Sequence, residues 1–285
     1  MFGFINVYKP KGKTSHDVVA ILRKITKIKQ IGHTGTLDPF AEGVLPICIG
    51  KATRLIEYLK DDKAYIGTIQ LGQATTTYDI EGEITKQSDK TPSIEEIKTI
   101  LGNFRGEIKQ LPPIYSAIKV NGKKLYEYAR EGKNIEIEPR IVNIDKLDIV
   151  NYNSTTRVLE IQVVCSKGTY IRSIANDIGE QLGVYGHLTK LIRIKAGDFK
   201  IDSSIKLDEL TKKEDVELNL IPPLNYLNYP RYQLNDKEKE LVTHGMPIQH
   251  NDLNINGTIL LTYNNEIASI GTIENNTIKS KKVFL

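Results

Sequence analysis

The sequence is poor in the residues that build disulfide frameworks and zinc sites. It has two cysteines, Cys48 and Cys165, and no tryptophan. Both cysteines lie in apolar runs far apart in the chain, which indicates buried thiols in a reducing compartment. No apolar run approaches the ~20 residues that a membrane-spanning helix needs, and the first residues lack the apolar core of a signal peptide. We therefore expect a cytoplasmic protein that does not contact a membrane.

Several catalytic and metal-binding motifs are also missing. The chain contains no phosphate-binding loop, no dinucleotide-binding glycine pattern in a suitable context and no G-x-S-x-G nucleophile turn. Its five histidines do not have the spacing of metal ligands. The sequence therefore predicts no metal site and none of the common nucleotide-binding folds.

What the chain does contain is an ordinary share of apolar (40%) and charged (26%) residues, as in a folded protein. Its 285 residues predict a large domain with a small one, or two of medium size. Residues 1–60 hold ten basic and four acidic residues, residues 105–146 hold nine and six, and residues 229–285 hold six of each. This distribution indicates either a basic surface for a polyanion or chance surface charge.

The spacing of apolar residues predicts helices and strands without strict alternation. We expect helices from Ser15, from Ser93 and after Gly168, and short helical stretches at 52–59 and 123–131. Strands are expected at 4–7, 44–49, 65–71, 135–150, 157–164 and 188–194. This pattern predicts an α+β fold with a mainly antiparallel mixed sheet flanked by helices.

The composition changes after about Tyr229. Short β-forming runs at 258–262 and 267–273 alternate there with turns rich in Asn and Gly, which is typical of a small β-barrel. We therefore predict a main domain over residues 1–228 and a C-terminal barrel over residues 229–285.

The loop at residues 32–43, GHTGTLDPFAEG, is the first candidate site. It is dense in turn-forming residues, and its glycines permit backbone conformations with positive φ. Asp38 in this loop either makes a local turn with the backbone that follows or does chemistry, and the residues alone leave both open.

The second candidate is the stretch SKGTYIR, which ends at Arg172. We expect a glycine turn and then a helix whose free N–H groups can hold an anion. Arg172 falls in the first helical turn, where the helix dipole disfavours a cation. Either a carboxylate or phosphate compensates this charge, or the side chain extends into solvent.

The third candidate interleaves basic residues with tyrosines between residues 110 and 133. Such a segment suits contact with an RNA backbone combined with base stacking. The alternative is a solvated amphipathic helix that carries tyrosines along its apolar edge.

Taken together, these stretches resemble the TruB family, the bacterial tRNA pseudouridine-55 synthases. GHTGTLDPFAEGVLPICIGKATR resembles the catalytic motif of the family, and INVYKPKGKTSHDVVAILRK resembles its N-terminal motif. QLPPIYSAIKVNGKKLYEYAREG is similar to its RNA-gripping insertion, SKGTYIRSIANDIGEQLG to its G-T-Y-I-R motif, and GHLTKLIRIKAGDF to the strand after it. The similarity keeps order and spacing over about residues 2–200. It implies a pseudouridine-synthase fold with an RNA-binding insertion at about 105–146 and a C-terminal PUA-like domain.

The resemblance also implies roles for individual residues. Asp38 matches the catalytic aspartate, Arg172 the arginine that pairs with it, and Tyr65 the tyrosine that packs against the target base. Matches to substrate-binding residues are Lys9, Pro10, His33, Tyr170 and Leu191. Candidates to hold the RNA backbone are the cations of the basic segment, Lys119, Lys123, Lys124 and Arg130, together with Arg193, which stands in the last motif where family members often have Arg-Arg.

The reaction implied by the resemblance isomerises uridine 55 in the T-loop of tRNA to pseudouridine. A C–N bond breaks and a C–C bond forms to the same sugar, so the reaction needs no oxidant, no net water and no cofactor. The base must first be flipped out of the loop, which costs a few kcal/mol. Arg172 is expected to keep Asp38 ionised, and Asp38 then attacks C6, attacks C1′ or removes a sugar proton.

The resemblance implies the T-stem-loop of tRNA as partner, and we expect a monomer that needs no protein partner. Two alternatives remain open at this point. One is a tRNA-binding folding helper without catalytic activity, and the other is a pseudouridine synthase that acts on a different RNA uridine.

Overall fold

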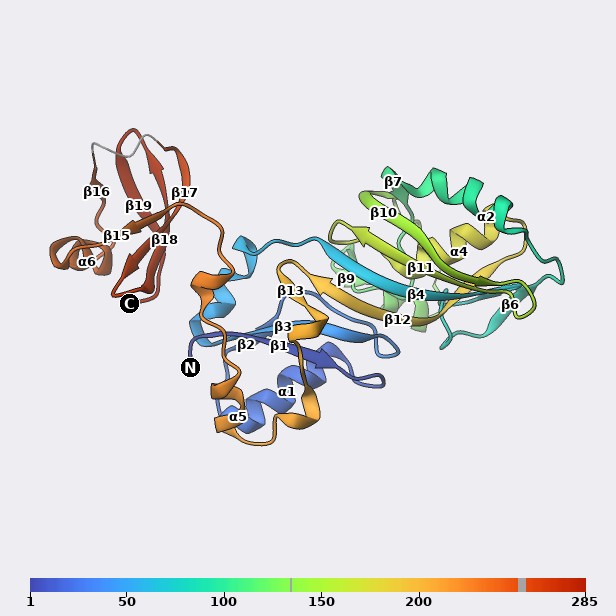
Figure 1. Ribbon diagram of the computed structural model, residues 1–285, viewed down its shortest axis with the longest axis horizontal. Helices are drawn as coiled ribbons and strands as arrows, with labels where there is room; N and C mark the ends of the chain where they lie inside the picture. The colour runs from blue at the N-terminus through green and yellow to red at the C-terminus, as the bar shows by residue number, and fades with distance from the viewer. Residues whose placement is uncertain (134, 251–254) are drawn as a thin grey trace.

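One long mixed sheet forms the main body of the computed structural model, which describes residues 1–133, 135–250 and 255–285 (Figure 1). Ten strands of these described residues belong to it. The order along the sheet is β14 (Ile205–Lys206), β1 (Gly3–Lys9), β3 (Glu42–Ile49), β12 (Gly186–Ala196), β4 (Lys63–Leu71), β11 (Val158–Cys165), β10 (Arg140–Asn153) and β7 (Gly106–Gln110). β2 (Ile31–His33) pairs with β3, and β13 (Phe199–Lys200) pairs with β12.

The predicted mainly antiparallel character of the sheet is confirmed. Only the pairs β1–β14 and β12–β3 are parallel within the described part of this sheet. Helices flank it, as predicted (Figure 1). α1 (Ser15–Thr26) and α5 (Lys213–Leu218) lie beside β1, and α2 (Ile94–Leu101) and α4 (Ile171–Gln181) lie beside the strands from β12 to β7. In the described ranges no helix is long and apolar enough to cross a membrane.

The apolar spacing read from the sequence corresponds to the buried faces of these helices. Ile171, Ile174, Ala175 and Ile178 of α4 are all buried in the core that α4 shares with β4, β11 and β12. α4 approaches the start of β12 closely at Gly179. A Cβ atom there would lie 2.1 Å from the backbone nitrogen of Gly186, so only glycine fits.

Several predicted boundaries shift in the structure. α1 is capped by Thr14 rather than Ser15, because the Thr14 hydroxyl accepts the N–H of Asp17 at 3.0 Å while the Asp17 carboxylate accepts the N–H of Thr14 at 2.7 Å. The predicted capping box of Ser93 is confirmed at the start of α2. The expected helix at 52–59 is a 3₁₀ helix over Gly50–Tyr58.

The predicted insertion contains a hairpin, whose second strand lies where the sequence pattern predicts the start of a helix. β8 (Lys119–Val120) pairs with β9 (Lys123–Lys124) across Asn121 and Gly122, which both have positive φ, as a tight hairpin turn requires. The helix expected at 123–131 therefore shortens to α3 (Leu125–Arg130). The strand expected from Ile135 begins only at Arg140.

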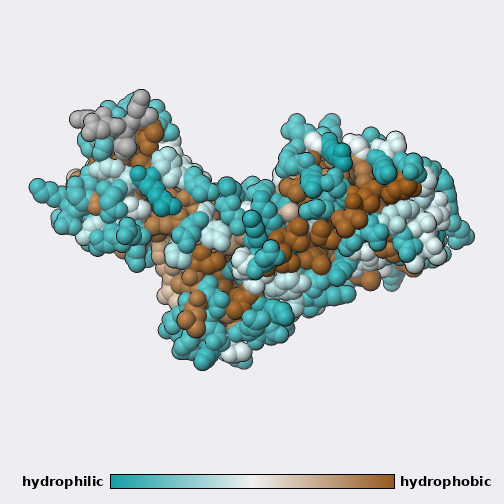
Figure 2. Space-filling model, in the orientation of Figure 1, coloured by the Kyte–Doolittle hydropathy of each residue, from teal (hydrophilic) through white to brown (hydrophobic). Residues whose placement is uncertain are grey.

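A second sheet forms the C-terminal part of the molecule. The described residues there contribute β15 (Arg231–Gln233), β17 (Gly257–Tyr263), β18 (Glu266–Glu274), β19 (Thr277–Val283), β16 (Ile248–Gln249) and the helix α6 (Asp236–Thr243). The five-stranded sheet matches the predicted PUA-like barrel, and α6 is added to it. This part packs on the main body through Phe284, whose ring stacks on Phe2 at 5.5 Å between centroids. The surface is hollowed between the C-terminal part and the end of the main sheet that carries β7 and β10 (Figure 2).

Candidate active site

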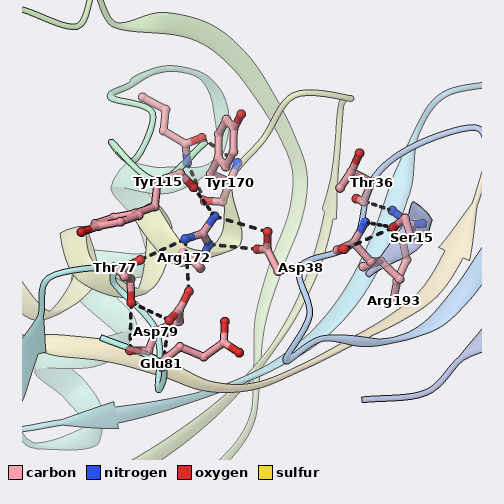
Figure 3. Close-up of polar contacts among 12 residues, drawn as sticks. Ser15, Thr36, Asp38, Thr77, Asp79, Glu81, Tyr115, Tyr170, Arg172 and Arg193 are labelled. Atoms are coloured by element: carbon pink, nitrogen blue, oxygen red, sulfur yellow. Dashed lines mark hydrogen bonds and ion pairs between the residues drawn. The ribbon is translucent and has the colours of Figure 1, made fainter. Parts of the chain in front are cut away.

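Asp38 and Arg172 form the ion pair that the sequence predicted, although 134 residues separate them. Nε of Arg172 lies 2.9 Å from Oδ2 of Asp38, and Nη2 lies 3.4 Å from Oδ1 (Figure 3). Asp38 comes from the loop before β3, and Arg172 from the first turn of α4. The Asp38 side chain is 33% exposed and the Arg172 side chain 6%. The carboxylate therefore faces outward, and the guanidinium supports it from behind.

Further acceptors hold the Arg172 guanidinium in place. Nη1 donates to the carbonyl of Thr77 and lies 3.1 Å from Oδ2 of the buried Asp79, while Nη2 donates to the carbonyl of Tyr115 (Figure 3). Asp79 is itself fixed, because its Oδ1 accepts the Thr77 hydroxyl at 2.6 Å and the N–H of Glu81 at 3.0 Å. Two carboxylates thus compensate the cation at the helix start, and the surface alternative for Arg172 is wrong.

Asp79 is a buried partner of Arg172 that sequence reasoning missed. It lies in the turn between β5 (Gln73–Thr75) and β6 (Ile84–Gln87), and an aspartate in a turn carries no distinguishing local signal. The preceding Tyr78 has a φ of 63°, and its carbonyl accepts the N–H of Leu188 at 3.0 Å. This strained turn is held against β12, where it directs both Thr77 and Asp79 toward Arg172.

Burial dominates the electrostatics of the Asp38 carboxylate. It raises the pKa of Asp38, the Arg172 guanidinium lowers it, and the neighbouring Asp79 charge raises it again, so that the pKa lies above its ordinary value. Arg172 therefore favours the ionised form of Asp38, as expected, but burial and the Asp79 charge oppose it. A carboxylate with a raised pKa is a stronger base than an exposed aspartate, because it holds a proton more tightly.

Three buried side chains hold the loop that carries Asp38. The Ser15 hydroxyl accepts the N–H of Leu37 at 2.8 Å and lies 3.2 Å from its carbonyl. Arg193 donates to the carbonyls of Gly35, Thr36 and Val44 at 3.0, 3.3 and 2.7 Å. The Lys9 ammonium donates to the carbonyl of Pro39, next to Asp38, at 3.4 Å. The loop is therefore fixed before any substrate arrives.

These contacts correct two predicted roles. Arg193 is 0% exposed, its guanidinium donates to three backbone carbonyls and it also hydrogen-bonds the Tyr65 side chain, so in this structure it does not present its charge to an RNA backbone. Lys9 is also 0% exposed, and burial lowers its pKa to about 8. Lys9 is thus a support of the Asp38 loop in this structure rather than a direct substrate contact.

A pocket of about 620 Å³ opens over the ion pair and brings together residues from the distant motifs. Of the predicted residues, it is lined by Asp38, Tyr65, Tyr170, Arg172, Leu191 and Arg130. Burial raises the pKa of the Tyr65 phenol, and the Arg193 cation only partly opposes this effect. Tyr65 is therefore neutral near pH 7, and it presents an aromatic ring and an O–H group rather than a phenolate.

The predicted insertion supplies one wall of the pocket through Tyr115, Ser116, Ala117, Tyr126 and Arg130. The cations predicted to hold RNA lie beside tyrosine rings, since Lys124 and Arg130 are each 5.3 Å from the Tyr126 centroid. Lys123 lies over Tyr128 and pairs with Glu131. Lys119 and Arg130 are exposed, so the segment presents its charge next to the pocket mouth.

Pro10 and His33 do not line this pocket. Pro10 borders a separate, mainly apolar cavity with Tyr8 and Lys13. His33, in β2, is half-buried, and burial together with the nearby Arg193 cation lowers its pKa, so that it is neutral at pH 7. Within the described ranges, no three His, Cys, Asp or Glu residues gather as metal ligands.

Comparisons with known proteins agree with this geometry. Residues 23–171 match the family model described as TruB family pseudouridylate synthase (N terminal domain), and residues 172–227 match tRNA pseudouridylate synthase B C-terminal domain. The chain is 42% identical to tRNA pseudouridine synthase B of Caldanaerobacter subterraneus and 43% identical to that of Staphylococcus haemolyticus, over 99% of each chain. A crystal structure of a Cbf5–Nop10–Gar1 complex is similar with a TM-score of 0.73 and 26% identity, covering 100% of this chain and 85% of that chain.

Proposed function

Because the chain belongs to the TruB family of pseudouridylate synthases, we propose that it converts uridine 55 in the T-loop of tRNA to pseudouridine, with Asp38 as the catalytic residue. The observation that carries this proposal is the partly exposed Asp38 carboxylate in a pocket that Tyr65, Tyr170 and Leu191 also line. We expect the enzyme to work as a monomer in the cytoplasm, without a cofactor or a protein partner.

The environment of Asp38 suits a group that must act as a nucleophile or a base. Its charge is aimed by Arg172, which cannot turn away because Asp79, Thr77 and the Tyr115 carbonyl hold it. A charge held in place before the reaction costs little reorganisation when the transition state forms. The raised pKa adds basicity, which favours attack on, or proton removal from, the flipped nucleotide.

Tyr65 and the apolar wall complete the proposed site. The neutral Tyr65 ring offers a face on which the uracil can stack, and Leu191 closes the same wall. Since a neutral phenol is a weak proton acceptor, we expect the C5 proton to leave through water that the Tyr65 hydroxyl orients. The flipped base would then be held between the Asp38 loop and the tyrosines of the insertion.

Release of tritium from tRNA labelled at uridine C5 tests the proposed reaction directly. C5 loses its hydrogen only if it becomes the carbon that bonds to the sugar. We expect release from wild-type tRNA transcript and none from a transcript with cytidine at position 55. Release that persists with the altered transcript would assign the enzyme to another uridine. Binding without any release would favour the folding-helper alternative.

A charge-neutralised insertion should bind tRNA more weakly and with less dependence on salt. We expect the triple change Lys123→Gln, Lys124→Gln and Arg130→Gln to reduce the slope of log K against log salt by about 2 to 3, since each phosphate contact contributes about 0.9. Filter binding from low to moderate salt measures this slope. The triple change Lys24→Gln, Lys27→Gln and Lys29→Gln removes the same charge at exposed positions near the end of α1. Equal slopes for the two triple variants would contradict a phosphate-binding role of the insertion.

A further inference from the structure

The base of the insertion is joined to the start of α4 at one place. We call residues 110–115, where the chain leaves β7, the insertion root. Pro112 and Pro113 have no N–H group, so the strand ladder ends at Gln110, opposite Arg140. The root then bonds to α4 instead. The Ser173 hydroxyl donates to the carbonyl of Leu111 at 2.9 Å, and Arg172 donates to the carbonyl of Tyr115 at 3.1 Å.

The side-chain amide of Gln110 makes two further bonds between the insertion root and the start of α4. Its Nε2 donates to the carbonyl of Tyr170 at 3.0 Å, and its Oε1 accepts the N–H of Tyr170 at 2.8 Å. The residue is 2% exposed, so water does not compete for these bonds. One amide therefore satisfies both backbone groups of one residue, which requires a donor and an acceptor at a fixed separation.

We call the two bonds between the Gln110 amide and the Tyr170 backbone the Gln110 clamp, and the position of Tyr170 matters for the site. It is the N-cap residue of α4, and no side chain of its own segment caps the helix. It also lines the pocket, and Arg172 follows two residues later in the same helical start. Any displacement of Tyr170 would therefore move a wall of the pocket and the partner of Asp38 together.

We propose that Gln110 is a positioning residue for the isomerisation. It holds Tyr170 and Arg172 in their positions relative to Asp38 and connects this arrangement to the RNA-binding insertion. The inference rests on the proposed function. Gln110 touches no reacting atom, and it acts through the backbone of Tyr170. Displacements of about 1 Å in a catalytic arrangement reduce rates by up to about 10²-fold. Loss of the clamp should therefore reduce the rate of the chemical step more than it reduces tRNA affinity.

The test compares Gln110→Met with Gln70→Met in single-turnover tritium release and in filter binding. Gln70 is a matched control, because its amide also donates to backbone carbonyls, those of Leu71 and Thr156 at 2.9 Å, but does not line the pocket. We expect Gln110→Met to lower the single-turnover rate by about 10- to 100-fold with a Kd within about threefold of wild type. Gln70→Met should match wild type in both. A Gln110→Met rate equal to that of Gln70→Met would overturn the inference.

A second variant separates positioning from a general loss of packing. In Gln110→Glu, a protonated carboxyl group offers one donor and one acceptor as the amide does, whereas the ionised group has only acceptors and repels the Tyr170 carbonyl. The ratio of its rate to the wild-type rate should therefore rise as the pH is lowered from about 8 to about 5.5, where a buried carboxyl group protonates. A ratio independent of pH would overturn the clamp. Absence of tritium release by the wild type would instead refute the proposed function.

Discussion

Replacement of Asp38 by asparagine should abolish pseudouridine formation, with a loss of about 10⁴-fold or more in the single-turnover rate. Asparagine keeps the shape of the side chain but is neither a nucleophile nor a base at neutral pH. Asp38→Asn should retain the fold, because Arg172 keeps its bonds to Asp79, Thr77 and Tyr115. Tritium release measures the loss, and filter binding should give a tRNA Kd close to that of wild type.

Asp148→Asn is the control for the Asp38 variant, since Asp148 also pairs with an arginine, Arg105, but at the surface. It should react at the wild-type rate. Near-normal turnover by Asp38→Asn would contradict the assignment of the catalytic residue. Because burial raises the pKa of Asp38, the acid limb of the wild-type pH–rate profile should lie above the range of an ordinary aspartate, with activity lost as the pH falls through that pKa.

Replacement of Arg172 by methionine should reduce both activity and stability. Without the guanidinium, the outward-facing Asp38 loses its orientation and the buried Asp79 loses its partner. Removing one partner of a buried ion pair lowers the free energy of unfolding by about 3 to 5 kcal/mol. We expect a rate about 10³-fold lower and a clearly lower Tm in thermal unfolding. The pKa of Asp38 should rise further, because its main compensating charge is gone. The acid limb of any residual activity should therefore lie at a higher pH than in wild type.

The double variant Arg172→Met with Asp79→Asn distinguishes catalysis from stability. The second change removes the carboxylate that the first leaves buried and unpaired, so the Tm should recover in part. Activity should not recover, because nothing then aims Asp38. A double variant that regained both Tm and rate would indicate that Arg172 acts only on stability.

The local sequence was sufficient to predict the α+β class, the antiparallel sheet and the buried face of α4. These features follow from apolar periodicity and capping residues, because such signals lie within a few residues of the helix or strand that they predict. The motif resemblance was sufficient to predict that Asp38, Tyr65, Tyr170 and Leu191 lie near one another, and all four line the same pocket.

Only the tertiary structure decided what surrounds these residues. Asp79 lies 93 residues before Arg172, and Gln110 lies 60 residues before Tyr170. A turn aspartate and a strand-end glutamine have no local pattern that names their partners. Arg193 was expected on an RNA surface because of its place in the family's last motif, yet β12 carries it into the core, where the carbonyls of Gly35, Thr36 and Val44 take the place of phosphates. Burial and long-range hydrogen bonds are properties of the packed chain, so the sequence determined which groups are available and the fold determined what each one touches.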